Sequence, residues 1–195
     1  MSHLMIDNDW APDFEMVRLL IHAGADINAA YIDDDNLLYH GTLLQRSVRR
    51  FVSGPKLSVV QLLLDNGAEI NTPATDNLGT ALQLAILSEE VEIAKMIIDH
   101  GADVNAHPAK NRRATASQAA AMHGYCGLAM RLLAKGADVA APAAPIDSRL
   151  AIDGAAEHAY LDIVHLLLNE YGDRPNPSFV CRRAAAAAER EVIST

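Results

Sequence analysis

The titratable residues that could carry chemistry gather in and beside the segment 29–41. They are Tyr31, Asp33, Asp34, Asp35, His40 and Arg50. An acid, a base and a cation at one place could run acid/base catalysis without a metal. The carboxylates could also hold a metal ion, but three consecutive acids point in different directions and form a poor ligand set. We therefore favour a solvated acidic loop, with acid/base chemistry as the alternative.

The two cysteines offer little further chemistry. Cys126 lies three residues after His123, and a catalytic thiol needs such a base, yet a small buried thiol is the commoner role. Neither Cys126 nor Cys181 belongs to a CxxC or Cys/His metal pattern. The sequence also lacks glycine-rich phosphate loops, GxSxG and HExxH. We predict no catalytic residues, no cofactor, no metal site and two free thiols in a reducing compartment.

The charge balance limits the partners. The 195 residues include 25 acidic and 16 basic side chains, and the formal charge is −9. Affinity for nucleic acid comes largely from Lys and Arg that neutralise phosphates, so nucleic acid is disfavoured as a partner. Arg49–Arg50 and Lys110–Arg113 are local basic exceptions. No apolar run approaches the roughly 20 residues of a membrane-spanning helix, so we expect an intracellular protein, in the cytoplasm or the nucleus, that does not enter a membrane.

One segment recurs along the chain and determines where these residues lie. It reads LLIHAGADIN, LLLDNGAEIN, MIIDHGADVN and RLLAKGADVA, followed by a weaker copy, LLLNEYGDRPN. Its glycine stands at positions 24, 67, 101, 136 and 172, so the successive spacings are 43, 34, 35 and 36 residues. A second segment recurs once before each of the later turn glycines. It reads GTLLQRSV, GTALQLAI, ATASQAAA and RLAIDGAA. Self-similarity at this period indicates an array of stacked structural repeats.

Each repeat carries the pattern of two helices. In VEIAKMIIDHG, apolar residues recur at helical spacing, and Gly101 follows where a C-terminal cap needs a residue without Cβ. A first helix is predicted to begin before this second one, at Thr80, whose hydroxyl can accept an N–H of the first turn. The 34 alanines and the 5% aromatic content favour closely packed helices over a β-sandwich or barrel. The sequence thus predicts an all-α fold of helix–turn–helix units joined by extended hairpin loops.

This pattern resembles the ankyrin repeat, in which a TPLH-type first helix is followed by an IVxLLL-type second helix and a GADVN turn. The resemblance covers about residues 12 to 178 and implies an ankyrin-repeat solenoid. It divides a single predicted domain, 1–195, into a partial repeat at 12–30, a repeat with insertions at 31–73, repeats at 74–107 and 108–142, a degenerate repeat at 143–178 and a partial C-terminal capping helix at 179–195.

The repeats depart from the family pattern in two respects. The TPLH histidine is replaced by Gln45, Gln83 and Gln118, and by Asp153 in the degenerate repeat. Glutamine can still bridge neighbouring turns by hydrogen bonds, but we expect a distorted first helix around Asp153. The 43-residue spacing also contains insertions, in AAYIDDDNLLYHG and RRFVSGPK. Such loops are either functional or tolerated on the surface.

The array begins irregularly. The partial repeat has only its second helix, and residues 1–11 do not resemble a first helix. Met16, Leu20 and Ile21 are then expected to face outward, unless residues 1–11 and the long loop cover them. Two alternatives remain for these exposed side chains. The chain could form a homo-oligomer through its exposed terminal repeats, or it could be a fragment of a larger protein.

The resemblance also implies a surface that binds a partner. In ankyrin repeat proteins this surface is concave and consists of the hairpin tips and the outward positions of each first helix. The corresponding residues here are Tyr31, Asp33, Asp34, Arg49, Arg50, Asp76, Leu87, Lys110, Arg112, Arg113, Met122, His123 and His158. We therefore predict a module that binds another protein. An enzyme or small-molecule binder that uses the groove near 29–41 is the alternative.

Overall fold

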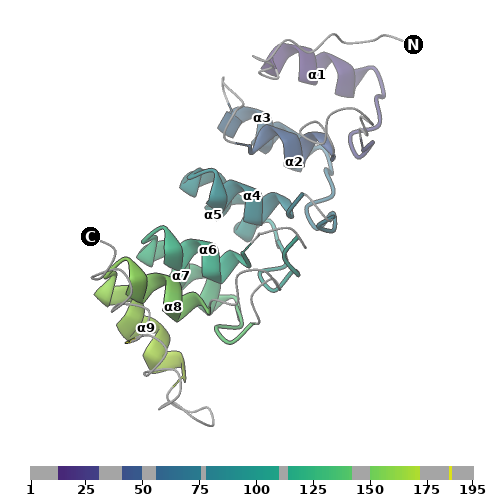
Figure 1. The fold of residues 1–195 in the computed structure, drawn as a ribbon. Coiled ribbons are helices and arrows are strands. Elements are labelled where there is room, and N and C mark those ends of the chain that lie inside the picture. Colours follow the sequence, from purple (N-terminus) through teal and green to yellow (C-terminus); the bar gives the residue numbers. More distant parts are fainter. Residues whose placement is uncertain are drawn as a thin grey trace. The chain divides into compact units, whose positions relative to one another are not determined.

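The structure is a computed structural model that describes residues 13–30, 41–49, 56–75, 78–109, 114–141 and 150–171, together with Ala185. Within these ranges the regular elements are helices, which confirms the predicted all-α fold (Figure 1). They are α1 (Phe14–His22), α2 (Leu43–Ser47), α3 (Lys56–Asp65), α4 (Ala81–Leu87), α5 (Val91–Asp99), α6 (Ala116–Met122), α7 (Cys126–Ala134), α8 (Ala151–Glu157) and α9 (Leu161–Tyr171). These helices fall into two compact units, α1 to α5 and α6 to α9.

The helices pair in the same way within each unit. A short first helix packs against the longer second helix that follows it, as α2 with α3, α4 with α5, α6 with α7 and α8 with α9 (Figure 1). Successive repeats stack like on like: α6 packs on α8, and α3 packs on α5. Helix α1 is a second helix that packs on α3. No first helix precedes it within the described residues.

The first helices are enclosed by the rest of their unit. Six successive residues are buried in each of three of them, namely Ala81–Ile86, Ala116–Ala121 and Ala151–Ala156. Six residues span more than one helical turn, so every face of these helices is covered. Alanine at many of these positions lets neighbouring helices approach closely, and this accounts for part of the alanine excess, although Leu82, Ile86 and Ile152 are buried in the same helices.

A reciprocal pair of hydrogen bonds begins each regular first helix. The Thr80 hydroxyl accepts the Gln83 backbone N–H at 3.3 Å, and Gln83 Oε1 accepts the Thr80 N–H at 3.1 Å. The same capping box joins Thr42 with Gln45 and Thr115 with Gln118. The cap predicted at Thr80 is therefore confirmed, and two otherwise unpaired N–H groups are satisfied in a buried setting.

The glutamines also connect one repeat to the next. Gln45 Nε2 donates to the Gly79 carbonyl at 3.2 Å, and Gln118 Nε2 donates to the Ala141 carbonyl at 3.1 Å. Because each amide has both an acceptor and a donor group, one side chain caps its own helix and holds the following repeat. The predicted bridging role of the glutamines is thus confirmed at Gln45 and Gln118.

The expected distortion of the helix around Asp153 is wrong. Helix α8 has 7 residues, as do α4 and α6, and its N-cap Leu150 has the same extended backbone as Thr80. The reason is that Asp153 Oδ2 accepts the Leu150 N–H at 2.9 Å. A carboxylate oxygen at this position therefore replaces the glutamine oxygen, although Leu150 offers no hydroxyl in return.

The asparagine that ends each GADxN turn makes a second connection between repeats. Asn28 Oδ1 accepts the Glu69 N–H at 2.7 Å, and Asn105 Oδ1 accepts the Asp138 N–H at 2.7 Å. Asn105 Nδ2 also donates to the Gly136 carbonyl at 2.9 Å. In the last regular turn, Ala140 stands at this position, and the nearby Val139 carbonyl accepts from the Tyr171 hydroxyl at 2.7 Å.

The turn between the two helices of a repeat requires a left-handed residue. Gly124 has φ +75°, and the residues 35 positions before and after it, Glu89 and Ala159, have φ 66° and 55°. A residue with a Cβ is disfavoured in this conformation. A Cβ at Gly124 would also lie 2.8 Å from the Tyr160 ring.

We expect opposite effects from two substitutions at this turn. Ala159→Gly should raise the free energy of unfolding by about 1 kcal/mol, because glycine relieves the left-handed strain. Gly124→Ala should lower it by more than about 1 kcal/mol, because it adds both strain and a clash with Tyr160. Urea unfolding followed by circular dichroism measures both values. Gly136→Ala, with φ +84° and open space at its Cβ, serves as the control for strain alone.

The cost of the glutamine connection can be measured in the same way. Gln118→Ala leaves the buried Thr115 N–H and the Ala141 carbonyl without this partner, so we expect a loss of about 2–3 kcal/mol in unfolding free energy. Gln61→Ala is the control, because within the described residues Gln61 donates to the exposed Asp65 of its own helix. Equal losses for the two variants would show that Gln118 adds nothing beyond helix propensity.

Candidate partner-binding surface

The described part of the chain contains five of the residues predicted to bind a partner. They are Arg49, Leu87, Met122, His123 and His158. The others lie outside the described residues: Tyr31, Asp33, Asp34, Arg50, Asp76, Lys110, Arg112 and Arg113, as does His40 of the acid/base alternative. Their roles stay predictions.

The five described residues stand at the C-terminal ends of first helices. Leu87 and Met122 are the last residues of α4 and α6, and both are half-buried. His123 and His158 follow directly as the C-caps of α6 and α8. Arg49 lies two residues beyond α2. Each of these ends is accessible, whereas the preceding turns of α4, α6 and α8 are buried.

Met122 also contributes to the packing between repeats. A Cβ placed on Gly154 of α8 would lie 2.5 Å from Met122 Cγ, so the methionine side chain rests on the glycine backbone. Part of Met122 is therefore committed to the contact between α6 and α8. A partner can contact only the remaining part of this side chain.

The two histidines are held by aromatic stacking. The His123 and Tyr125 rings lie 5.6 Å apart at an interplanar angle of 11°, and the His158 and Tyr160 rings lie 5.8 Å apart at 9°. His158 Nδ1 is also 3.0 Å from the Gly154 carbonyl oxygen. A carbonyl can only accept, so Nδ1 carries the proton and Nε2 is the acceptor of the neutral ring. The two histidines are thus restrained before any partner arrives.

The tyrosines of this surface were missed by the sequence reasoning. Their signal was the tripeptide His-x-Tyr, which recurs 35 residues apart at 123–125 and 158–160. Tyr160 lies over Gly124 and so contacts the preceding repeat across the boundary between two repeats. In the first unit, Glu90 occupies the position of these tyrosines and forms an ion pair with Lys56 at 2.6 Å. The same position of the repeat therefore contacts the preceding repeat through an ion pair at Glu90 and through an aromatic ring at Tyr160.

Cys126 is a poor nucleophile in this setting. Desolvation by burial raises the pKa of the Cys126 thiol above its ordinary value, and the charge and hydrogen bonding of Asp162 raise it further. His123, the base partner considered from the sequence, instead stacks on Tyr125. The thiolate that nucleophilic catalysis requires is therefore disfavoured at neutral pH.

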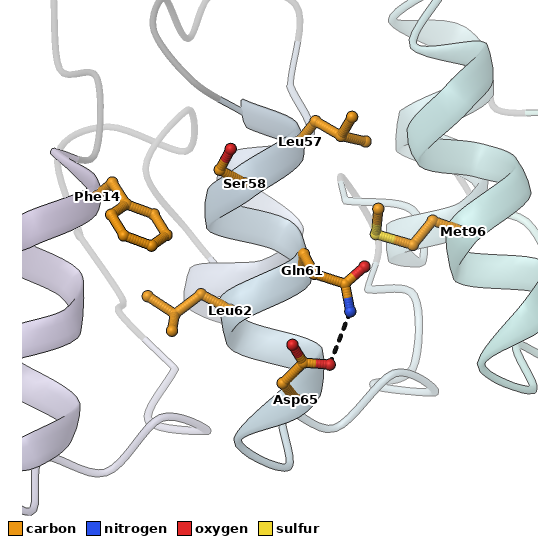
Figure 2. Close-up of a pocket in the computed structure, with 7 residues that line it drawn as sticks. All are labelled: Phe14, Leu57, Ser58, Gln61, Leu62, Asp65 and Met96. Carbon is orange, nitrogen blue, oxygen red and sulfur yellow. Dashed lines mark hydrogen bonds between the residues drawn. The ribbon is translucent and has the colours of Figure 1, made fainter.

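An open groove of about 380 Å³ lies on the second helices of the first unit. Figure 2 shows its lining, which is Phe14, Leu57, Ser58, Gln61, Leu62, Asp65 and Met96. Its amide and carboxylate bond each other, as Gln61 Nε2 donates to Asp65 Oδ1 at 2.7 Å. The lining thus offers no pair of catalytic groups.

The described residues show neither a grouped set of metal ligands nor a membrane-spanning helix. Among the residues that the structure describes, no three His, Cys, Asp or Glu side chains are grouped as a metal site would require. Within those residues, no helix is long and apolar enough to cross a membrane.

Comparisons with known proteins agree with the repeat pattern. A family model described as ankyrin repeats, in three copies, matches residues 44–143. The chain is 38% identical over 88 residues to the ankyrin repeat and KH domain-containing protein mask-1 of Caenorhabditis elegans, which covers 45% of this chain and 3% of that protein. It is 29% identical over 119 residues to an ankyrin repeat protein of Acanthamoeba polyphaga mimivirus, covering 53% and 38% respectively. The chain thus spans well under half of either relative.

The raised thiol pKa leads to a chemical prediction. In a Cys181→Ser background, Cys126 should react with iodoacetamide at pH 8 more slowly than free cysteine, because little thiolate is present. Asp162→Asn removes the nearby carboxylate, lowers the thiol pKa and should speed alkylation severalfold. Glu170→Gln, which removes an exposed acid elsewhere on α9, should leave the rate unchanged. Mass spectrometry follows the modification, and fast alkylation of Cys126 in the Cys181→Ser background would contradict the raised thiol pKa.

Proposed function

Because the chain belongs to the ankyrin repeat family, we propose that it binds another protein through the accessible ends of its first helices and the loops predicted beside them. Rigid stacked repeats present side chains at regular intervals, and variation at those positions sets which partner binds. The described residues that we assign to this role are Arg49, Leu87, Met122, His123 and His158.

The observation that carries this proposal is the abrupt change in burial along the first helices. In α4, α6 and α8, six successive residues are buried, and the next residues, Leu87, Met122 and Glu157, are half-buried. The packed part of each helix cannot contact a partner without unfolding. A binding surface on these helices must therefore use their C-terminal ends.

The side chains at these ends suit protein recognition. Leu87 and Met122 offer apolar contact area, and His158 Nε2 can accept a hydrogen bond from a partner. The stacked histidines lose little rotamer freedom on binding, because Tyr125 and Tyr160 already restrain them. Such preorganisation reduces the entropic cost of association.

The experiment uses the full chain as bait to identify a partner, followed by calorimetry with the purified pair. The double variant His123→Ala, His158→Ala should weaken binding by about tenfold or more, since two restrained contacts are lost. Arg49→Ala with Arg112→Ala should weaken it through the basic positions, mainly by slowing association.

The control for the histidine variant is His165→Ala, which removes an exposed histidine from the second helix α9. It should keep the parent affinity, and all variants should keep the parent melting temperature. Unchanged affinity in the double histidine variant would remove the ends of α6 and α8 from the binding surface.

A further inference from the structure

The turn that follows α3 contains two neighbouring residues that can react with each other. They are Asn66 and Gly67, and both are exposed. The residues before the other turn glycines are Ala23, His100, Lys135 and Tyr171. Asn66 is thus the one side-chain amide at this position of the repeat, and no other asparagine of the sequence precedes a glycine.

Asparagine before glycine can cyclise, because glycine has no Cβ to crowd the attacking nitrogen. Hydroxide would remove the proton of the Gly67 nitrogen, which then bonds to Asn66 Cγ. The bond from Cγ to Nδ2 breaks, and Nδ2 takes a proton from water and leaves as ammonia. Water then opens the five-membered imide at either carbonyl carbon, which gives aspartate or an isoaspartyl link. The net change replaces ammonia by water and needs no oxidant or reductant.

The closed turn restrains both reacting groups. The Gly67 N–H donates to the Leu64 carbonyl at 3.1 Å, which keeps the proton on the attacking nitrogen. Asn66 Nδ2 donates to the Leu62 carbonyl at 2.8 Å, which holds the leaving nitrogen against α3. Cyclisation therefore requires the end of α3 to open, and helix ends open at a lower free-energy cost than the core.

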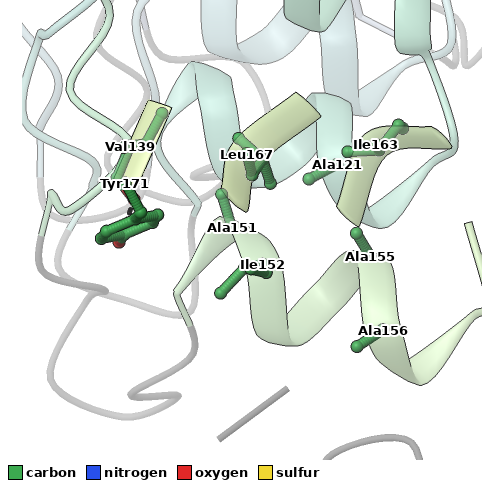
Figure 3. Packing of buried hydrophobic residues seen from close by; sticks show 9 residues of the cluster. All are labelled: Ala121, Val139, Ala151, Ile152, Ala155, Ala156, Ile163, Leu167 and Tyr171. Atoms are coloured by element: carbon green, nitrogen blue, oxygen red, sulfur yellow. Dashed lines mark hydrogen bonds between the residues drawn. The ribbon is translucent and has the colours of Figure 1, made fainter. Parts of the chain in front are cut away.

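This turn is less firmly anchored than the two turns that follow it. The apolar residue three positions after its glycine is Ile70, which is half-buried. The counterparts, Val104 and Val139, are exposed by only 7% and 2%. Figure 3 shows Val139 within the buried cluster of the second unit, where its carbonyl also accepts from the Tyr171 hydroxyl. Opening should thus be easier at residues 66–70 than at the later turns.

The preceding repeat helps to keep the turn closed. Asn28 Oδ1 accepts the Glu69 N–H at 2.7 Å, and Asn28 Nδ2 donates to the Gly67 carbonyl at 3.4 Å. Gly67 therefore supplies the attacking nitrogen and also belongs to the link with the turn after α1. Loss of the Asn28 side chain should favour opening and hence cyclisation.

We propose that Asn66 is a site of spontaneous and irreversible conversion to aspartate and isoaspartate, with water as the co-reactant, and that Asn28 limits its rate. The new carboxylate lies beside Asp65 at the C-terminal end of α3, where the helix dipole disfavours negative charge. The isoaspartyl form also adds a methylene to the backbone just ahead of Gly67. The conversion should therefore weaken the link to the turn after α1 and loosen α1 itself.

The first experiment measures the conversion in the full chain at mildly alkaline pH. Peptic digestion at acidic pH followed by mass spectrometry should find the amide exchanged for a carboxylate at Asn66 but not at Asn71, which precedes threonine. A blocked peptide of residues 62–71 should react severalfold faster than the chain, because it lacks the restraining bonds. Asn28→Ala should also speed the reaction severalfold, whereas Asn105→Ala, which removes the equivalent link in the second unit, should not.

Two further variants separate the chemistry from the opening of the turn. Gly67→Ala strains the turn at φ +83° and should loosen it, yet conversion should slow because the added Cβ crowds the nitrogen. Asn66→Gln keeps an amide that would have to close a six-membered ring, so conversion should vanish. The proposal is overturned by equal rates in the chain and the peptide, by an unchanged rate in Asn28→Ala, or by an unreacted Asn66 once the peptide has reacted fully.

The second experiment tests the consequence for α1. Ion exchange separates the converted chain by its added negative charge, and amide hydrogen exchange compares it with the unreacted chain. Exchange across residues 17–29 should be severalfold faster after conversion. Asn66→Gln, incubated in the same way, is the matched control and should exchange like the unreacted parent. Equal exchange in the converted and unreacted chains would overturn the inferred loosening of α1.

Discussion

The enclosure of the first helices is the constraint on which the rest of the structure depends. A helix surrounded on every side favours small side chains at most positions, and it has no water beside its unpaired backbone groups. Alanine supplies the small side chains. The reciprocal hydrogen bonds between Thr80 and Gln83 satisfy backbone N–H groups at the start of the helix. Where the same amide also reaches the following repeat, as from Gln118 to Ala141, capping and stacking become one interaction. Loss of the amide therefore affects both at once.

The repeat pattern made much of this fold predictable from the sequence. Periodic apolar residues and turn glycines predicted the helix pairs, and the Thr80 cap followed from side-chain chemistry. The prediction at Asp153 failed because it considered the residue type and overlooked that a carboxylate oxygen accepts the same N–H as an amide oxygen. The left-handed residues Glu89 and Ala159 were also missed, since neither residue type signals that conformation.

The candidate surface was less predictable than the fold. The positions at the helix ends followed from the register, but the stacking of His123 on Tyr125 required coordinates. The burial of part of Met122 against Gly154 likewise depends on the neighbouring repeat. The insertion at 29–41 has no periodicity, so the sequence supplied residue types there without a geometry. Of the three side chains expected to face outward, Met16 and Leu20 are exposed, whereas Ile21 is half-buried. The contrast between α1 and the other second helices emerged only in three dimensions.

The asparagine connections have a consequence for how such a chain can change in length. Asn105 bonds the backbone of the repeat that follows it, and the repeat before it makes an equivalent bond through Asn71 to the Gly101 carbonyl. The acceptor is a main-chain carbonyl of the turn. The asparagine of one repeat could therefore form the same hydrogen bond to the turn of any duplicated repeat that follows it. Whole-unit duplication is therefore structurally self-consistent up to Asn105. After Ala140, which has no side-chain amide, an inserted unit would have to be held by other contacts.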